Sequence, residues 1–282
     1  ISWVVNDGDG NSGTVLSTVN ITAANEVPIL KGSVATINFT ENDGATVIDS
    51  SLIVTDVDDT DLELATITIS TGYVGSEDVL EFNNQNGIIG IWDSENGVMT
   101  LSGISSKTNY ETALVSVTYN NISDVPNTDF RTIAWLINDG TDNSLRILST
   151  VNVTAVNDLP ALGDAGDSLA FTENDGATVI DQNLSVTDVD DTNLESVTIT
   201  ISTGYVSRED VLGFSAQNGI TGNWEPESGI MSLTGSASKA NYETALESVT
   251  YNNTSDAPNI SSRIITWVLN DGNDSSAKVT ST

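Results

Sequence analysis

The sequence predicts an all-β protein built from tandem β-sandwich modules, each with one short helix. Three observations support this prediction. Asp7, Asp139 and Asp271 occupy the same Asn-Asp-Gly triplet, so the chain repeats at a spacing of 132 residues, the difference between positions 7 and 139 and between 139 and 271. Short runs alternate apolar residues with Thr or Ser, which is typical of strands with one buried face. Asn-Gly pairs, which accept the positive φ angles of tight turns, separate such runs.

The repeat sets the expected domain organisation. Residues 39–48 and 171–180 are identical in sequence. The period has the usual size of a domain, so each repeat can bury its own core, unlike solenoid repeats of about 20–50 residues. We expect 26–157 and 158–282 to form two modules and 1–25 to be the last strands of a preceding module. We interpret the chain as part of a longer array, whose role depends on number and length.

Strand patterns dominate each repeat. Leu64–Ser70 and Ser196–Ser202 alternate over most of their length, and Thr on the exposed face suits a pleated sheet. Further strand-like runs occupy 34–39, 132–137 and 147–155. Many short strands with regular turns predict a β-sandwich.

One short helix is expected in each repeat. Tyr110 and Leu114 stand four residues apart within Asn109–Leu114, and the same pattern returns in Asn241–Leu246. That spacing places both side chains on one helix face. Strand-like residues follow directly in both repeats.

The charge balance restricts the partners. The chain has 40 acidic and 8 basic residues and a net charge of −32. Nucleic acid and anionic membranes need a basic surface, so neither is an expected partner. No long apolar run is present, so we expect no direct membrane insertion. Self-repulsion at this charge favours bound cations, although plain solubility, as in proteins from salty habitats, is an alternative explanation.

Missing residue types narrow the chemistry. Cysteine and histidine are both absent, which excludes disulfides, thiolate or imidazole metal sites, and catalysis by either residue. The remaining metal ligands are carboxylate, amide and carbonyl oxygens, which suit calcium or magnesium.

The acidic motifs are expected to meet where modules join. Antiparallel strands send alternate loops to opposite poles. In the first repeat this argument brings together Asp56, Asp58 and Asp139 beside the entry linker, Asn25 and Glu26. In the second it brings together Asp188, Asp190 and Asp271 beside Asn157 and Asp158, with Glu41 reaching that junction from the other side. Calcium accepts about six to eight oxygens in irregular geometry and so suits such a joint better than magnesium. Each motif alone is also ordinary turn chemistry.

These motifs resemble cadherin repeats. The matching elements are Glu41-Asn42, Thr55-Asp56-Val57-Asp58, Asp139-Gly140 and Asn157-Asp158-Leu159-Pro160, with their second-repeat copies. The resemblance implies Greek-key, Ig-like sandwiches that bind calcium between domains. It assigns Glu41, Asn157, Asp158, Asp188, Asp190 and Asp271 to one junction. It assigns Asn25, Glu26, Asp56, Asp58 and Asp139 to another, and Glu173 to a third. The hairpin sequence Asn138-Asp139-Gly140 leaves open whether Asn138 or Asp139 is the calcium ligand.

The middle of the repeat carries a second resemblance. Residues 86–120 are similar to cadherin-like repeats of very large bacterial surface proteins. The similarity lies in the motifs Asn-Gly-Ile…Trp, Leu-x-Gly and Asn-Tyr-Glu-x-Ala-Leu-x-Ser-Val-Thr-Tyr-Asn. Those proteins resemble type I-secreted biofilm adhesins with RTX-style C-termini. The resemblance implies a secreted or cell-surface, calcium-stiffened extender that projects a distal binding domain in cell adhesion or biofilm formation. Its expected partners are calcium ions and neighbouring repeats.

Two other functions compete with the extender. A homophilic or carbohydrate-binding module could use Trp92 beside Asp93, and Trp224 beside Glu225, as a sugar platform. A Trp in a sandwich hairpin more often packs in the core or at an edge. Paired carboxylates could also hydrolyse glycosides. We expect no enzyme, because an active site gains little from being copied in series.

Overall fold

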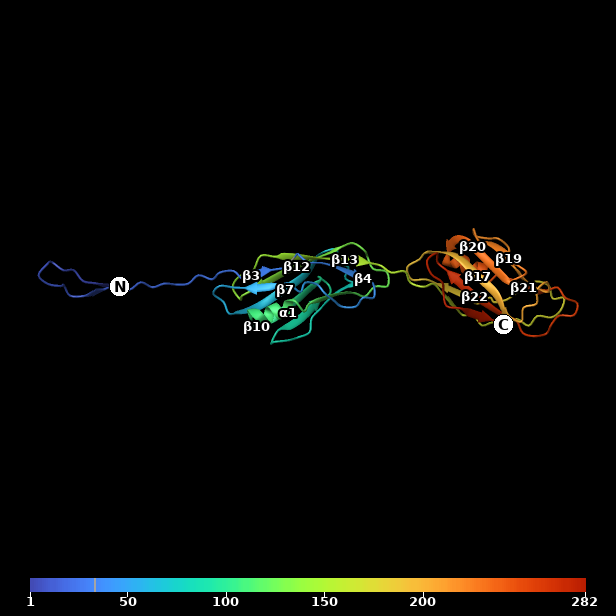
Figure 1. Cartoon of the computed structure of the whole chain (residues 1–282), viewed down its shortest axis with the longest axis horizontal. Coiled ribbons are helices and arrows are strands. Elements are labelled where there is room, and N and C mark those ends of the chain that lie inside the picture. The colour runs from blue at the N-terminus through green and yellow to red at the C-terminus, as the bar shows by residue number, and fades with distance from the viewer. Residues whose placement is uncertain (33) are drawn as a thin grey trace. The chain divides into compact units, whose positions relative to one another are not determined.

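The computed structural model describes residues 1–32 and 34–282 (Figure 1). It divides into two compact units. One comprises Ile1–Ile122 and Thr128–Val153, and the other comprises Ser123–Asn127 and Thr154–Thr282. The order of strands and one helix recurs in both repeats, except that residues 168–172 form no strand where their counterparts 36–40 do. Each repeat has its own sheets and its own core.

The first repeat, 26–157, is called the first module. Its elements are β3 (Ile29–Lys31), β4 (Thr36–Thr40), β5 (Thr46–Val47), β6 (Ile53–Thr55), β7 (Asp61–Thr71), β8 (Asp78–Glu81), β9 (Ile89–Asp93), β10 (Val98–Ser106), α1 (Lys107–Leu114), β11 (Thr118–Asn121), β12 (Arg131–Asn138) and β13 (Ile147–Thr154). A six-stranded sheet has the order β4-β13-β12-β7-β10-β9. A second sheet has the order β5-β11-β8, and β3 pairs with β6.

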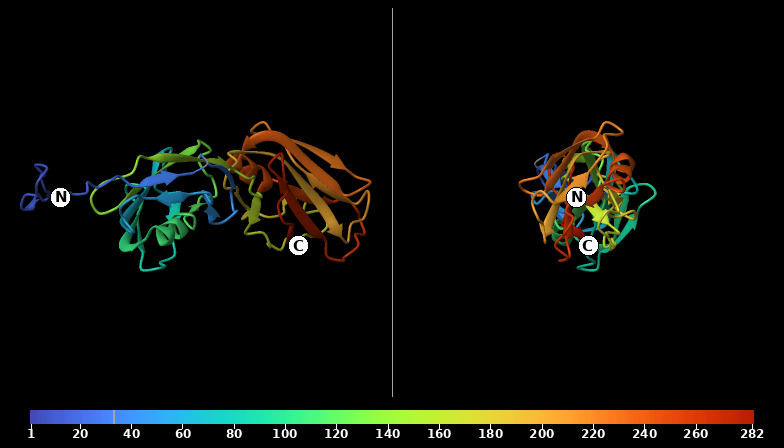
Figure 2. Two further views of the ribbon diagram at one scale, coloured as in Figure 1. Left: turned by 60° about the vertical axis from the view of Figure 1, so that its left-hand side comes forward. Right: turned by 90° about the vertical axis from the view of Figure 1, so that its right-hand side faces the viewer.

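The second repeat, 158–282, is called the second module. Its elements are β14 (Ala161–Gly163), β15 (Thr178–Val179), β16 (Ser185–Thr187), β17 (Asn193–Thr203), β18 (Asp210–Gly213), β19 (Thr221–Glu225), β20 (Ile230–Ser238), α2 (Lys239–Leu246), β21 (Thr250–Asn253), β22 (Ile264–Asn270) and β23 (Val279–Ser281). The large sheet has the order β19-β20-β17-β22-β23, and its strands lie side by side in Figure 2. A smaller sheet has the order β15-β21-β18, and β14 pairs with β16.

The predicted strands are present. The two alternating runs lie inside β7 and β17, and residues 132–137 lie inside β12. β4 begins at Thr36 rather than at Val34, whose φ of 51° does not fit a strand. Both short helices form over the predicted residues. The structure therefore confirms the all-β sandwich with one helix per module.

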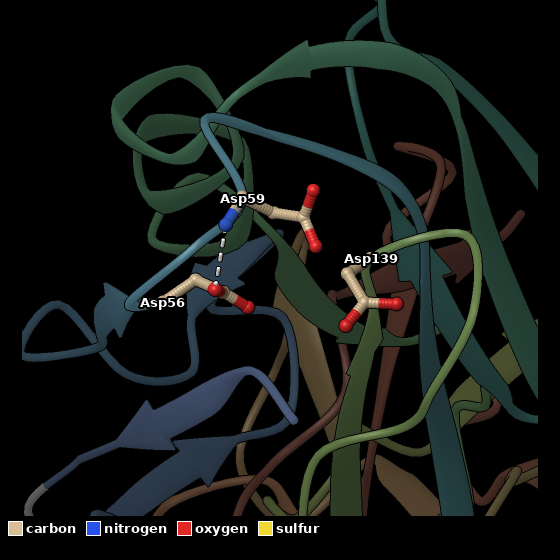
Figure 3. A group of neighbouring side chains, drawn as sticks. All are labelled: Asp56, Asp59 and Asp139. Atoms are coloured by element: carbon tan, nitrogen blue, oxygen red, sulfur yellow. Dashed lines mark hydrogen bonds between the residues drawn. The ribbon is translucent and has the colours of Figure 1, made fainter. Parts of the chain in front are cut away.

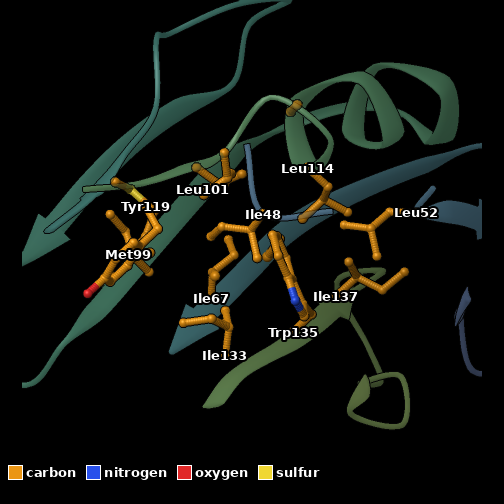
Figure 4. Packing of buried hydrophobic residues seen from close by; sticks show 14 of the residues in the cluster. Ile48, Leu52, Ile67, Met99, Leu101, Leu114, Tyr119, Ile133, Trp135 and Ile137 are labelled. Carbon is orange, nitrogen blue, oxygen red and sulfur yellow. The ribbon is translucent and has the colours of Figure 1, made fainter. Parts of the chain in front are cut away.

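Each core lies between the sheets and beneath the helix. In the first module, Trp135 of β12 packs with Ile67 of β7, Tyr119 of β11 and Leu114 of α1, and all four are fully buried (Figure 4). Complete burial of such a side chain contributes about 1.5–3 kcal/mol. Because the cluster joins residues from different layers, it holds the sandwich together.

The helix is fixed at its start and along one face. The Ser106 hydroxyl caps α1 by accepting the Asn109 N–H. Tyr110 is buried, and its hydroxyl donates to the Gly103 carbonyl at 2.8 Å. Gly103 has a φ of 138°, and a Cβ there would lie 2.3 Å from the Gly87 carbonyl oxygen, so only glycine fits. Neither described helix is long and apolar enough to cross a membrane.

A buried ion pair joins the small sheet to the large one. Asp78 of β8 accepts hydrogen bonds from the Tyr119 hydroxyl at 2.6 Å and from Arg131 Nε at 3.0 Å. Neither charged side chain is exposed. The second module repeats the arrangement with Asp210 and Arg263. A buried pair with its hydrogen bonds made is stable, whereas loss of one partner leaves the other charge unpaired.

Residues 1–25 keep the contacts of a final module hairpin. Strands β1 (Ser2–Trp3) and β2 (Val15–Leu16) pair, and Trp3 Nε1 donates to Ser17 Oγ at 2.9 Å. Trp135 and Ser149 make the same contact in the first module. Trp3 is 56% exposed, whereas Trp135 is fully buried. The hairpin therefore forms without a core, and its assignment to a preceding module stays a prediction.

Candidate metal centre

Two strand ends place the acidic loops at one pole of each module. In the first module, Asn138 at the end of β12 pairs with Leu64 near the start of β7. Asp139 follows the first of these strands, and the loop from Asp56 to Thr60 precedes the second. The topology therefore brings together loops that are far apart in sequence. In the second module the loops that follow β16 and β22 meet in the same way beside the start of β17.

Three carboxylates gather at this pole of the first module. Asp56, Asp59 and Asp139 each offer an oxygen within 4.8 Å of the other two (Figure 3). Asp56 Oδ1 accepts the N–H groups of Asp58 at 3.1 Å and Asp59 at 3.0 Å. This turn curls the loop, so that Asp59 rather than Asp58 joins the group.

The second module repeats the group in a more buried form. Asp188, Asp191 and Asp271 also bring one oxygen each within 4.8 Å of one another. Asp188 is 9% exposed and Asp271 6%. Asp188 Oδ1 accepts the Asp191 N–H at 2.8 Å, whereas its buried Oδ2 has no hydrogen-bond partner among the described residues. An uncompensated buried carboxylate oxygen is costly, so a cation is the group that this arrangement fits.

The entry linker of each module docks on the same pole. Asn25 Nδ2 donates to Asp139 Oδ2 at 3.1 Å, and the Glu26 N–H donates to Asp58 Oδ2 at 3.2 Å. In the second module Asn157 donates to Asp271 at 3.0 Å, and the Asp158 N–H donates to Asp190 at 3.2 Å. Within the part of the chain that the structure describes, the buried atoms Asp158 Oδ2 and Asp190 Oδ1 have no hydrogen-bond partner. Linker and loops thus supply a shared set of oxygens.

Crowding disturbs the titration of these carboxylates. Desolvation, followed by the charges of Asp58, Asp56 and Asp139, raises the pKa of Asp59 above its ordinary value. Desolvation and the charge of Asp190 likewise raise the pKa of Asp191. Burial and nearby like charges both favour the protonated form of a carboxyl, which accounts for the upward direction of these pKa shifts.

Hydrogen bonds lower the pKa of the two hairpin aspartates, Asp139 and Asp271. Desolvation acts to raise the pKa of Asp271, but the Asn157 amide and the N–H groups of Asp274 and Asn273 outweigh it, so the pKa is lowered. Asp139 behaves in the same way. These two carboxylates are held ionised, as a metal ligand must be.

A lysine holds each acidic loop from behind. Lys107, the first residue of α1, donates from Nζ to the Asp56 carbonyl at 2.7 Å and to the Asp59 carbonyl at 2.5 Å. Lys239 makes the same two contacts with Asp188 and Asp191. The ammonium groups therefore bind backbone carbonyls of the acidic loops, and no ion pair is formed between these lysines and the carboxylates of Asp56, Asp59, Asp188 or Asp191 among the described residues.

The structure brings together most of the predicted site residues. In the first module Asn25, Asp56, Asp58 and Asp139 share one pole, and Glu26 contributes its N–H there. In the second module Asn157, Asp158, Asp188, Asp190 and Asp271 do the same. Metal ligation by these residues stays a prediction.

Three details were not anticipated from the sequence. Asp59 and Asp191 occupy the places expected for Asp58 and Asp190 in the tight groups. Asp142 also accepts a hydrogen bond from Asn25, at 3.0 Å. Asn138 is engaged in its hairpin, where its Oδ1 accepts the Gly140 N–H at 2.7 Å, so Asp139 is the hairpin residue that joins the group. The run of adjacent aspartates was the signal for the first detail, because an Asp side chain commonly accepts N–H groups two and three residues ahead.

The two predicted glutamates, Glu41 and Glu173, lie in the loops that precede β5 and β15. Glu41 directly follows β4 and is 5% exposed. Glu173 occupies the same place in the second repeat and is exposed. Their proposed contribution to junctions stays a prediction.

The tryptophans suggested as sugar platforms are packing residues. Trp92 lies on the edge strand β9, is half-buried, and meets Tyr73 edge to face at a centroid distance of 6.1 Å. Trp224 meets Tyr205 at 6.2 Å in the same geometry. Both tryptophans are partly buried and pack against the core of their own module.

Comparisons with known proteins give one sequence relative and several structures. No family model matches the chain. Halomucin from Haloquadratum walsbyi is 37% identical over 120 residues, which are 41% of this chain and 1% of halomucin. The match therefore covers about one hundredth of the length of that relative.

Solved structures that are similar to the chain include cadherin extracellular domains. Protocadherin gamma B2 domains 1–5 are 14% identical, with 98% of this chain and 43% of that chain covered and a TM-score of 0.37. Drosophila N-cadherin EC1–4 is 13% identical, with 91% and 49% covered and a TM-score of 0.35.

Proposed function

We propose that the chain is a calcium-stiffened extender segment of a secreted or cell-surface adhesion protein of the large RTX type. Its modules would project a distal binding domain in cell adhesion or biofilm formation. The observation that carries the proposal is the acidic group at the linker pole of both modules, above all the buried, unpartnered Oδ2 of Asp188. The resemblance of 86–120 to repeats of bacterial surface proteins supports the cellular setting.

The donor set favours calcium. In the second module the proposed ligands are the carboxylates of Asp188, Asp191, Asp271 and Asp190 and the amide oxygen of Asn157, which are hard oxygens. Calcium takes about six to eight such oxygens without strict geometry, whereas magnesium needs a near-ideal octahedron. A group assembled from two loops and a linker meets the first requirement more easily than the second.

Stiffening follows from where the linker is held. The Glu26 N–H donates to Asp58 in an exposed position, and the Asp158 N–H donates to Asp190 in a part-buried one. Hydrogen bonds that water can reach open easily. An ion bound by oxygens of the linker and of both loops would hold the linker against the loops and restrict the motion of the linker.

Calcium titration of the whole chain tests the proposal. Calorimetry should show binding in the range of about 10⁻⁴–10⁻³ M, typical of extracellular modules, with magnesium much weaker. Calcium should raise Tm by linkage, because each occupied site adds about 2.7 kcal/mol to the free energy of unfolding at a calcium concentration 100 times Kd. Small-angle scattering with and without chelator should show the chain becoming stiffer with calcium.

A variant pair localises the effect. Asp188→Ala with Asp191→Ala should remove the binding of the second module and leave the first unchanged. Glu227→Ala with Asp256→Ala removes the same charge at exposed positions and should bind calcium as the parent chain does. Absence of binding heat and of any Tm shift in about 10 mM calcium, about tenfold above the upper end of that Kd range, would refute the proposal.

A further inference from the structure

The outer face of the large sheet in the first module carries exposed aliphatic side chains. Ile89 and Ile91 of β9 are 53% and 63% exposed, and Leu148 of β13 is 48% exposed. Side chains alternate between the two faces of a sheet. Trp92 and Ile147, which are next to these residues in sequence, pack against the core. The three aliphatic side chains therefore point away from the core.

Strand register aligns the outward residues of this sheet in three rows. The first row, from β13 to β9, consists of Leu148, Ala134, Thr68, Val98 and Asp93. The second, from β12 to β9, consists of Leu136, Thr66, Thr100 and Ile91. The third, over the same strands, consists of Asn138, Leu64, Ser102 and Ile89. We call these rows the outer face; aliphatic and hydroxyl side chains dominate it.

The second module has the same register but a more polar face. Its rows consist of Thr280, Thr266, Thr200, Ile230 and Glu225, then Val268, Thr198, Ser232 and Asn223, then Asn270, Ser196, Thr234 and Thr221. Threonine suits the exposed face of a sheet. Because this sheet forms with Thr or Ser where the first module has Leu64, Ile89 and Leu148, the fold does not need those aliphatic residues. They indicate a contact outside the module.

Charge is nearly absent from the outer face of the first module. The chain has 40 acidic residues, yet the three rows contain one carboxylate, that of Asp93 at a corner. A basic partner would be attracted to the acidic loops and would gain little at this face. An occupant that fits must be flat, uncharged and partly aliphatic. The same face of a second copy of this chain has these properties.

We propose that the outer face of the first module binds the outer face of a second copy of this chain. The contact is isologous, with the same residues contributed by both copies. Sheets pack face to face about 10 Å apart, with their strands aligned to within about 30°. In this arrangement the side chains of Ile89, Ile91 and Leu148 leave water.

The edges of the outer face are complementary in charge. β7 is the middle strand of β13-β12-β7-β10-β9, so a two-fold axis along β7 places β9 of each copy over β13 of the other. Asp93 at the end of β9 then approaches Arg146, which precedes β13, in the other copy. Both residues are exposed, and Arg146 has no ion pair among the described residues. Each dimer would form two such pairs.

The size of the outer face limits the strength of the contact. Five strands about 4.8 Å apart, each contributing about five residues of about 3.4 Å, give a face of about 24 Å by 17 Å, or about 400 Å². Two such faces bury about 800 Å², below the roughly 1,200–2,000 Å² of stable complexes. The dimer should therefore be weak and reversible, with Kd on the order of 0.1–1 mM.

The charge of the rest of the chain makes the contact dependent on salt. Each copy carries −32, so two copies repel at low ionic strength. The Debye length falls from about 10 Å at 0.1 M to about 3 Å at 1 M salt. Association should strengthen as salt is added, which is opposite to the behaviour of a contact held by ion pairs alone.

Sedimentation equilibrium of the full chain in about 1 M NaCl with chelator tests the proposal. The parent chain should dimerise as its concentration approaches about 1 mM, the upper end of the expected Kd range. Ile89→Thr with Ile91→Asn should weaken dimerisation by at least about tenfold, because the aliphatic contact is lost. The second module carries these residues, Thr221 and Asn223, at the same positions of the same strand, so the sheet tolerates them.

A matched control removes two exposed aliphatic side chains elsewhere. Val47→Thr with Ile53→Ser changes β5 and β6, which belong to other sheets of the module. Ser185 is the counterpart of Ile53 in the second repeat. This variant should dimerise as the parent does. Equal weakening by both variants would show that the outer face is not the contact and would overturn the proposal.

Engineered thiols report the geometry, since the chain has no cysteine. Thr66 lies on β7 at the centre of the outer face, so the two copies of this residue face each other across the axis. Thr66→Cys with a short bis-maleimide should give covalent dimers, and these should disappear when Ile89→Thr and Ile91→Asn are added. Ile53→Cys, on β6, should stay monomeric.

Two results would overturn the proposal. A parent chain that stays monomeric at about 1 mM in high salt would assign the outer face to a different protein. Crosslinking of Ile53→Cys as efficient as that of Thr66→Cys would show random collision rather than a defined dimer. Because chelator is present throughout, failure here leaves the calcium proposal untouched, and failure to bind calcium leaves this one untouched.

Discussion

Asn157 donates a hydrogen bond from Nδ2 to Asp271 Oδ2 at 3.0 Å, which ties the linker of the second module to the hairpin after β22. Its Oδ1 accepts from Asn273 Nδ2 at 2.9 Å. The amide therefore presents a donor to the acidic group. A bound cation needs the amide oxygen there instead, and a half-turn of the side-chain amide supplies it.

This geometry predicts opposite effects of one substitution. Asn157→Asp should destabilise the second module by about 1–3 kcal/mol without calcium, because a donor becomes a further negative charge beside Asp188, Asp191 and Asp271. With calcium the added carboxylate should tighten binding, so the calcium-induced rise in Tm should exceed that of the parent chain. Differential scanning calorimetry in chelator and in calcium measures both. Asn223→Asp, on the exposed edge strand β19, adds the same charge and should alter neither quantity.

The lysine behind each loop predicts a second effect. Lys239→Met removes two hydrogen bonds to the carbonyls of Asp188 and Asp191 and should lower the stability of the second module by about 1–3 kcal/mol. Calcium affinity should fall as well, because the loop loses its anchor. A rise in affinity would instead show that removal of the positive charge outweighs the loss of anchoring. Chemical denaturation and calorimetric titration distinguish these outcomes.

The buried ion pair predicts a large effect far from the acidic group. Asp210→Asn leaves Arg263, whose side chain is 10% exposed, without its carboxylate. Removal of one partner from such a pair costs about 3–5 kcal/mol. Urea denaturation should show this loss, whereas the exposed Asp256→Asn should stay within about 0.5 kcal/mol of the parent. Calcium binding should persist in both variants under conditions where they are folded.

The same residue predicts an acid transition. Desolvation acts to raise the pKa of Asp210, but hydrogen bonds from Arg263 and Tyr251 outweigh it and lower the pKa. A depressed native pKa gives stability above the unfolded value of about 3.9, and this stability is lost as pH falls through the native value. Tm of the second module should therefore decline below about pH 4. Asp210→Asn should flatten this part of the curve, and an unchanged slope would contradict the assignment.

A glycine at the strand bulge predicts a backbone effect. Gly235 has a φ of 140°, and a Cβ would lie 2.3 Å from the Gly219 carbonyl oxygen. Gly235→Ala should cost about 2–4 kcal/mol, through both strain and displacement of β20. Gly219 has a positive φ but open space around it, so Gly219→Ala should cost only about 1–2 kcal/mol. Thermal unfolding of the two variants separates steric contact from backbone preference.

Local patterns were enough to predict the sheets and the helices. Alternation over most of Leu64–Ser70 marked β7, and the spacing of Tyr110 and Leu114 marked α1. The alternation of loops between poles was enough to bring Asp56 and Asp139 to the same end of the module. Each of these features depends on periodicity, which a sequence states directly.

Details that depend on exact backbone geometry were not predicted. Asp59 replaces Asp58 in the tight group because the Asp56 carboxylate accepts both following N–H groups and turns the loop. Lys107 reaches the carbonyls of that loop from the start of a helix about fifty positions later in the chain. The pairing of Asp78 with Arg131 likewise joins strands of two sheets. No short-range pattern in the sequence marks such contacts.

The parallel pairing at the outer edge of the large sheet has a mechanical consequence. β4, near the beginning of the first module, lies beside β13, at its end. In the second module Thr282 donates its N–H to the Asp167 carbonyl and accepts the Leu169 N–H, which is the hydrogen-bond pattern of parallel strands. When a module is pulled by its two ends, parallel terminal strands slide past each other. Their hydrogen bonds then bear the load simultaneously rather than opening one after another. A tether made of such modules would resist shear from a moving fluid and yield only when several bonds rupture at once.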